Sequence, residues 1–88
     1  MDISHWRNRI DVLDRKILKL LNDRARCVLA LVPLKKKTGI PIYEPDREAE
    51  VFRNISENNG GPLSAEAVKR IYERLIDEMR SIQRGPKQ

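Results

Sequence analysis

The fold of this chain is decided by residues 4–37, whose sequence is SHWRNRIDVLDRKILKLLNDRARCVLALVPLKKK. Its apolar residues recur at spacings of three, four and seven, as on one face of a helix: Trp6, Ile10, Leu13, Ile17, Leu20, Leu21, Val28 and Leu31. The pattern predicts one long helix that begins near Ser4, a good N-cap residue, and ends at the stop signal formed by Thr38 and Gly39. Pro33 removes a backbone donor inside this helix, and we expect a kink there because the apolar pattern continues beyond it.

A helix of this length cannot be covered by the rest of its own chain. About 34 residues at a rise of about 1.5 Å each give a rod of about 50 Å. A compact chain of 88 residues has a diameter of only about 30 Å. The protruding apolar stripe therefore needs a second subunit, and an antiparallel two-fold homodimer is the simplest closed arrangement.

Two shorter helices are predicted after the long one. Pro45 suits the first position of a helix that runs to about Glu57, and Ser64 caps a third helix that ends near Gly85. We expect an all-α fold of three helices, with the long first helix forming an intertwined antiparallel homodimer. Residues 1–88 are interpreted as a single domain, with a flexible tail at 84–88.

The composition indicates a globular protein of a reducing compartment. Hydrophobic residues make up 40% and charged residues 35% of the chain, which is not a disordered composition. The longest apolar run is too short for a bilayer span, and no apolar signal stretch is evident at the N-terminus. Cys27 is the only cysteine and His5 the only histidine, which argues against a disulfide or a His-rich metal site. We expect a cytoplasmic location.

The basic charge of the chain is concentrated on the long helix. The net charge is +5, and residues 1–37 alone carry +6, which favours anionic partners, either nucleic acids or small carboxylates. Arg24 falls on the apolar stripe, where it forms either a structural ion pair or part of a ligand site. Lys35, eleven residues later, points about 20° from the same direction, whereas Arg7 points about 100° away. Arg7 therefore cannot easily serve the same pocket from its own helix, whereas a partner helix could bring its copy there.

Further polar residues complete a candidate cavity. Gln83 continues the apolar stripe of the third helix four residues after Met79, and Arg47 and Glu48 open the second helix. Together with Arg24 and Lys35 these residues predict a cationic cavity with an amide and with carboxylates at one rim. The sequence has no evident nucleophile–base pair or phosphate loop, so such a cavity suits the electrostatic handling of a small polyanion.

The sequence resembles the all-helical chorismate mutases over residues 6–83. The matching strings are R-x-x-I-D-x-L-D-x-x-I-L-x-L-L-x-x-R at residues 7–24, then Lys35, then GIPIYEPDRE at residues 39–48. Ile76 and Gln83 stand in the expected places of the third helix. The resemblance implies a homodimer with two sites that convert chorismate to prephenate by an intramolecular rearrangement, which needs no acid, base or cofactor.

The resemblance also implies how the substrate carboxylates are held. Arg24 and the partner subunit's Arg7 would bind the two carboxylates, and Arg47 would assist them. Met79 departs from the family pattern, because family members often carry at this position a small hydroxyl residue that contacts a carboxylate. We therefore expect that contact to be missing here.

The remaining site residues are assigned, by the same resemblance, to the ether oxygen and the ring hydroxyl. Lys35 and Gln83 would donate hydrogen bonds to the ether oxygen as its bond breaks. Glu44 and Glu48 would meet the ring hydroxyl, Glu48 through its side chain. The expected partners are thus a small dicarboxylate and a second copy of the chain, with no nucleic acid and no membrane.

Three alternatives remain open on the sequence. An isochorismate-pyruvate lyase would use a similar cationic pocket on the same scaffold, although the stretch from Glu44 to Glu48 favours a mutase. A non-enzymatic basic dimer would bind nucleic acid through Lys35, Lys36 and Lys37, yet the aromatic residues are too few and scattered for base stacking. A domain that regulates or attaches to another enzyme of aromatic biosynthesis is the third alternative.

Overall fold

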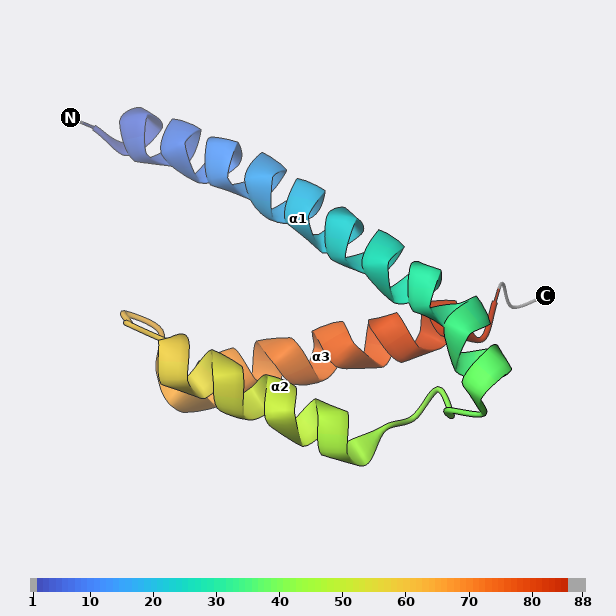
Figure 1. The fold of residues 1–88 in the computed structure, drawn as a ribbon. Helices are drawn as coiled ribbons and strands as arrows, with labels where there is room; N and C mark the ends of the chain where they lie inside the picture. The colour runs from blue at the N-terminus through green and yellow to red at the C-terminus, as the bar shows by residue number, and fades with distance from the viewer. Residues whose placement is uncertain (1, 86–88) are drawn as a thin grey trace.

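The structure, a computed structural model, describes residues 2–85 and is all-helical over that range (Figure 1). It contains α1 (Ile3–Thr38), α2 (Pro45–Asn58) and α3 (Ala65–Gln83). The predicted all-α class and its three helices are therefore confirmed. Residues 86–88, in the predicted tail, lie outside the described residues.

The long helix begins two residues earlier than the sequence pattern predicted. Asp2 is the N-cap residue, and its carboxylate accepts a 3.0 Å hydrogen bond from the backbone N–H of His5. The expectation of a cap near Ser4 is wrong. Asp2 is the better cap, because its negatively charged carboxylate also interacts favourably with the positive end of the helix dipole. The predicted stop is confirmed: Gly39 has a φ of 75°, in the left-handed region, and its N–H donates to the carbonyl of Lys35.

Pro33 does not end α1, which runs unbroken through it to Thr38. In Figure 1 the last turns of α1 leave the direction of the rest of the helix. Such a bend is the expected effect of a proline, whose ring crowds the carbonyl of Leu29 and leaves it without an N–H partner. Leu29 is exposed, so water can reach the freed carbonyl.

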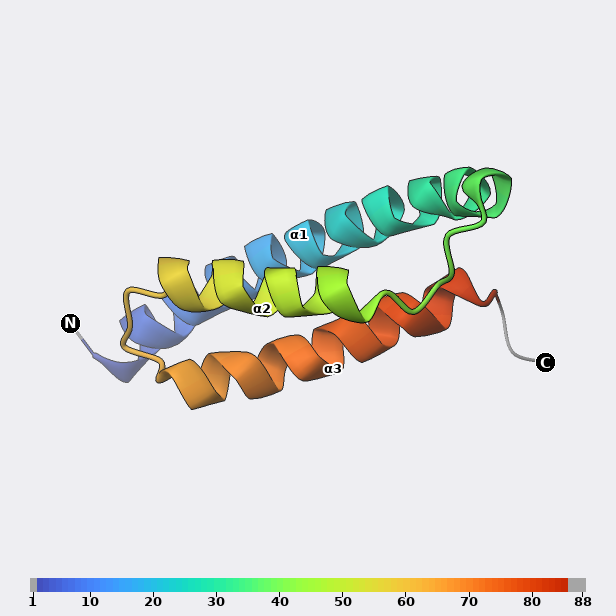
Figure 2. The same cartoon turned by 60° about the horizontal axis from the view of Figure 1, so that its bottom comes forward.

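The two shorter helices begin at the predicted residues. Pro45 occupies the start of α2, and the Ser64 hydroxyl accepts a 3.1 Å hydrogen bond from the N–H of Ala67 at the start of α3. The end of α2 at Asn58 is one residue beyond the predicted end at Glu57. Because α2 and α3 are joined by a short loop, they form a hairpin of two adjacent helices (Figure 2).

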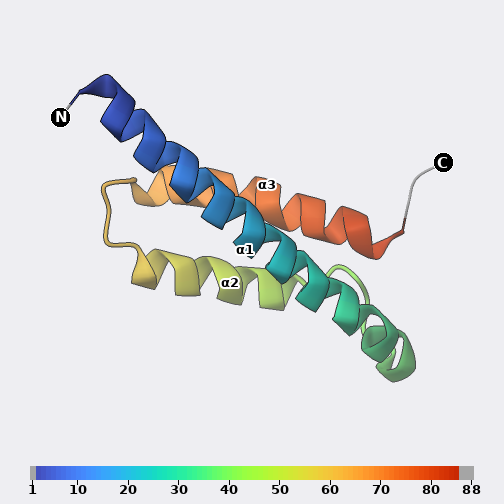
Figure 3. The same ribbon diagram turned by 90° about the horizontal axis from the view of Figure 1, so that it is seen from above.

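The hairpin and α1 meet only at one end of the molecule. α3 contacts both α1 and α2, and Figures 1 and 3 show α1 crossing the hairpin obliquely and diverging from it toward its own N-terminus. Within residues 2–85 the buried apolar side chains are Ile76 and Met79, both on α3. The core of a single chain is therefore small and lies near the convergence of the three helices.

The apolar stripe of α1 is left uncovered in a single chain. The molecule extends 55 Å along its longest axis, and stripe residues remain open to solvent, with Leu20 64% and Ile17 53% exposed. α1 is nevertheless no membrane span: none of the helices within residues 2–85 combines the length and apolar character that crossing a bilayer requires.

Candidate active site

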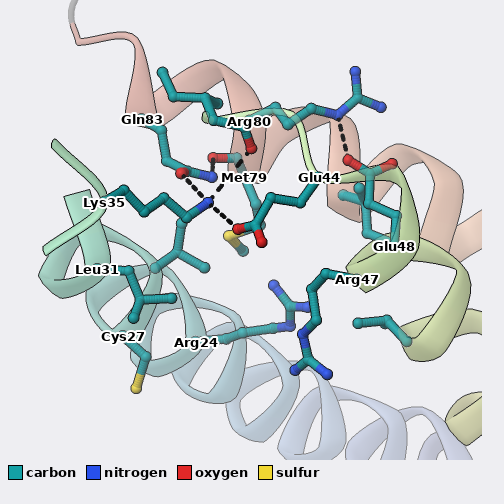
Figure 4. Close-up of a pocket in the computed structure, with 14 residues that line it drawn as sticks. Arg24, Cys27, Leu31, Lys35, Glu44, Arg47, Glu48, Met79, Arg80 and Gln83 are labelled. Atoms are coloured by element: carbon teal, nitrogen blue, oxygen red, sulfur yellow. Dashed lines mark hydrogen bonds and ion pairs between the residues drawn. The ribbon is translucent and has the colours of Figure 1, made fainter. Parts of the chain in front are cut away.

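A cavity of about 270 Å³ lies where the C-terminal part of α1, the start of α2 and the end of α3 converge (Figure 4). All three helices and the segment between α1 and α2 contribute side chains to it. The predicted site residues that line this cavity are Arg24, Lys35, Glu44, Arg47, Glu48, Met79 and Gln83. The structure therefore brings residues from distant parts of the chain together around one cavity.

Arg7 is the predicted site residue that the single chain does not bring to the cavity. It lies near the start of α1, in the part of the helix that diverges from the hairpin (Figure 1). This placement agrees with the helical geometry of the sequence, in which Arg7 points away from the line of Arg24 and Lys35. Arg7 is therefore not among the residues that line the cavity of a single chain.

Lys35 lies at the centre of a contact network in the cavity. Its Nζ is 2.9 Å from Oε1 of Glu44, donates a 3.1 Å hydrogen bond to Oε1 of Gln83 and lies 3.4 Å from the carbonyl oxygen of Ile42. The side chain is only 13% exposed. All three N–H groups of the ammonium are thus engaged, and the bend after Pro33 does not turn Lys35 away from the cavity.

Gln83 is oriented by contacts at both ends of its amide. Its Oε1 accepts the hydrogen bond from Lys35, and its Nε2 donates a 3.2 Å hydrogen bond to the backbone carbonyl of Met79. An amide nitrogen carries two N–H groups, so one donor remains after the contact with Met79. Gln83 and Lys35 therefore form a pair of fixed donors at one end of the cavity.

Two of the three arginines that line the cavity form a second cationic region. Arg24 from α1 and Arg47 from α2 extend into the same part of the cavity in Figure 4. Arg47 forms an ion pair with Glu50. Within residues 2–85 no carboxylate lies within ion-pair distance of half-buried Arg24. The alternative of a structural ion pair is therefore not found for Arg24, and its guanidinium is available to an anion.

Arg80 is a cavity residue that the sequence interpretation missed. Its Nε lies 3.0 Å from Oε2 of Glu48, and an Nη nitrogen donates a 2.9 Å hydrogen bond to Asp77. The signal was present in the spacing, because Arg80 stands four residues after Ile76 and three before Gln83, on the face that contains both. Among the many surface arginines it was overlooked because an arginine on α3 fits an exposed face equally well.

The charges that line the cavity favour a small anion. Arg24, Lys35, Arg47 and Arg80 provide four positive charges, and Glu44 and Glu48 provide two negative ones, so the lining is net positive by two. Met79 contributes a buried thioether at the position where a hydroxyl residue was noted as the family pattern. Within residues 2–85 there is no cluster of three or more metal-ligating side chains. The chemistry of such a cavity suits the binding of an anionic molecule through fixed charges and hydrogen bonds.

The fold and the cavity define a class of protein: a small all-helical domain with a net-positive pocket formed by three helices. The family model for chorismate mutase type II matches residues 6–84, and the chain belongs to this family.

Two relatives show the extent of the similarity. The bifunctional chorismate mutase/prephenate dehydratase of Neisseria gonorrhoeae is 42% identical over 78 residues, which cover 89% of this chain and 21% of that protein. The chorismate mutase of Methanocaldococcus jannaschii is 30% identical over 91 residues, which cover 93% of this chain and 84% of that one. The chain thus spans about a fifth of the length of the bifunctional relatives that it matches.

Solved structures of the same fold cover nearly the whole chain. The form II structure of the chorismate mutase of Thermus thermophilus superimposes with a TM-score of 0.91 at 28% identity, covering 98% of both chains. The chorismate mutase of Helicobacter pylori, solved in complex with prephenate, gives a TM-score of 0.85 at 28% identity and covers 93% of this chain and 89% of that chain.

Proposed function

We propose that this chain is a chorismate mutase domain, residues 1–88, that rearranges chorismate to prephenate in the cytoplasm as an antiparallel homodimer. The observation that carries the proposal is the contact between Lys35 and Gln83 at one end of a net-positive cavity. Membership in the chorismate mutase family supports it, as does a structural relative that was solved with prephenate.

The two carboxylates of chorismate are bound by the arginines of the cavity. Arg24 takes one carboxylate, because its guanidinium lines the cavity without a carboxylate partner within residues 2–85. Arg47 assists from α2, and Arg7 of the partner subunit binds the second carboxylate. Planar guanidinium groups suit carboxylates because they donate two parallel hydrogen bonds.

The chemical step is assisted by Lys35 and Gln83. The rearrangement is unimolecular, so the protein has only to hold a folded conformer of the substrate and stabilise charge that grows on the ether oxygen. Lys35 exchanges its longest contact, the 3.4 Å one to the Ile42 carbonyl, for the ether oxygen. Gln83 donates the N–H that is not bound to Met79. Fixed donors of this kind are typically worth about 3–4 kcal/mol in the transition state.

The carboxylates of the cavity accept hydrogen bonds from the ring hydroxyl of the substrate. Glu44 and Glu48 lie on the α2 side of the cavity, and each is compensated by a cation, Glu44 by Lys35 and Glu48 by Arg80. A compensated carboxylate accepts a hydrogen bond from a hydroxyl without adding a free negative charge beside a dianion. No further reactant or cofactor enters this scheme.

A second copy of the chain completes the site. The exposed apolar stripe of α1 supports pairing with a partner α1, and an antiparallel arrangement carries Arg7 of each chain toward the convergence of helices in the other. The nucleic-acid alternative is weakened by the placement of Lys35, because its shielded side chain faces the cavity and breaks up the lysine run.

The test is the conversion of chorismate by the purified chain. We expect loss of chorismate with formation of an equal amount of prephenate, and no salicylate or pyruvate when isochorismate is supplied. Arg24→Ala is expected to abolish most of the activity. Arg26→Ala is the matched control, because Arg26 is exposed and pairs with Asp23. A folded chain that leaves chorismate unchanged contradicts the proposal, and one that releases salicylate and pyruvate supports the lyase instead.

A further inference from the structure

Arg80 is held from three directions at the edge of the cavity. Its Nε lies 3.0 Å from Glu48 of α2, and it is hydrogen-bonded to Asp77 one turn earlier on α3. Its guanidinium carbon also lies 5.3 Å from the centre of the Tyr43 ring, in the segment between α1 and α2. These contacts connect α3 to α2 and to the segment between α1 and α2.

The pair of Arg80 and Glu48 is the more shielded of the two ion pairs formed by Arg80. The Glu48 side chain is 18% exposed and that of Arg80 28% exposed, whereas Asp77 is 57% exposed. In the view of Figure 4, Glu48 lies between Arg80 and the part of the cavity that Arg24 and Arg47 enter. Arg80 lines the cavity, and its more shielded ion-pair partner there is Glu48.

The contact between Arg80 and Glu48 is electrostatic more than directional. The Nε atom of Arg80 is buried, and its N–H makes no well-aligned hydrogen bond, although Glu48 lies at ion-pair distance. A partly buried carboxylate whose cation is removed is left uncompensated, which is costly. In this cavity the cost increases when a dianion binds, because the like charges then share a low-dielectric space.

We propose that Arg80 is a positioning residue of the site, which fixes the carboxylate of Glu48 and neutralises its charge toward the bound dianion. The inference rests on the proposed function and assigns Arg80 no contact with the substrate. The two carboxylates of the cavity then have different cationic partners. Lys35, which is proposed to act on the ether oxygen, compensates Glu44, whereas Arg80 compensates Glu48. A purely structural ion pair between α2 and α3 would change stability but not substrate affinity.

The experiment is a double-mutant cycle on the purified chain with chorismate as substrate. Arg80→Gln is expected to raise KM about ten-fold, equivalent to about 1.4 kcal/mol. We expect it to change kcat less than about two-fold, because Glu48 meets a hydroxyl present in both substrate and transition state. In a Glu48→Gln background the same substitution is expected to change KM less than about two-fold, because the carboxylate on which Arg80 acts is gone.

Arg74→Gln is the matched control, because Arg74 is on the same helix and forms a 3.1 Å ion pair with Glu78, outside the cavity. It should leave KM unchanged, and Arg80→Lys, which keeps the charge, should recover most of the wild-type affinity. If Arg80→Gln does not fold, Arg80→Lys carries the same cycle, with a smaller rise in KM that disappears in the Glu48→Gln background.

The outcomes separate this inference from the function on which it rests. A folded wild-type chain that forms no prephenate contradicts the proposed function, and the inference falls with it. An active wild type in which the KM effects of Arg80→Gln and Glu48→Gln simply add contradicts the inference alone. So does an Arg80→Gln variant that loses thermal stability but keeps the wild-type KM.

Discussion

The amide oxygen of Gln83 accepts a 3.1 Å hydrogen bond from Nζ of Lys35, although the two residues are 48 positions apart in the chain. The contact joins the last turn of α1 to the last residue of α3. Glu44, at the start of α2, holds the same ammonium. The two proposed donors to the ether oxygen are therefore aligned by folding itself, before any substrate binds.

Lys35→Ala is expected to lower kcat by about 100-fold to 1,000-fold while changing KM much less, because Lys35 is proposed to act on charge present mainly in the transition state. Steady-state kinetics with chorismate measures both constants. Lys36→Ala is the matched control, because Lys36 is the exposed neighbour of Lys35 on the same turn. A near-normal kcat in Lys35→Ala would show that another residue stabilises the ether oxygen.

Gln83→Glu is expected to make activity depend on pH. A glutamine amide donates at every accessible pH, whereas a carboxyl group donates only when protonated, and its model-peptide pKa is about 4.3. Lys35, which contacts this position, stabilises the ionised form further. The variant should therefore be poorly active at neutral pH and gain kcat as the pH falls, while the wild type changes comparatively little. Equal activity of the two proteins from about pH 5 to about pH 8 would mean that Gln83 does not contact the breaking bond.

The chain is expected to sediment as a dimer at micromolar concentration, because the apolar stripe of α1 has no cover within one chain. Analytical ultracentrifugation over a dilution series measures the mass. Ile17→Asp places a charge in the middle of the stripe and should shift the protein toward monomer with loss of activity. A well-folded monomer with full wild-type activity is the result that contradicts both the dimer and the shared site.

Arg7→Ala and Arg24→Ala are expected to complement each other in mixed dimers. Each variant alone is inactive if both arginines serve every site. If each site takes Arg7 from one chain and Arg24 from the other, as proposed, one site of a mixed dimer carries both defects and the other carries none. Random reassembly of an equal mixture after unfolding should then restore about one quarter of the wild-type activity.

The controls for this experiment are each variant refolded alone and a mixture that was never unfolded. None of them should regain activity beyond what slow subunit exchange allows. Mixed dimers confirmed by mass, yet without activity, would place Arg7 and Arg24 in the site of one chain.

The helices were predictable because their signals are local. The apolar spacing of α1, the proline at the first position of α2 (Pro45) and the caps at Ser64 and Gly39 depend on neighbouring residues only, and the structure has all of them. The first cap was predicted at Ser4 and lies at Asp2, because two good cap residues compete within one turn. The apolar spacing of the helix does not reflect that Asp2 carries a negative charge and Ser4 does not.

The cavity was predictable in its membership and less so in its contacts. Spacing along one helix placed Arg24 and Lys35 on the same face, and both line the cavity. Spacing cannot show which residue on another helix stands opposite, so the pairing of Lys35 with Gln83 and of Arg80 with Glu48 emerged only from the packing. Arg80 shows this limit most clearly, because its partner Glu48 lies 32 positions earlier.

The sparse interior of the single chain has a thermodynamic consequence. Burial of apolar surface is the main source of the heat-capacity change of unfolding, and within residues 2–85 only Ile76 and Met79 are buried apolar side chains. In the proposed dimer, the pairing of two copies would add to that heat-capacity change by covering the apolar stripe of α1. Folding would be a second-order reaction whose melting temperature rises with protein concentration. Dilution of the protein would therefore favour dissociation of the dimer and, with it, unfolding of the chain.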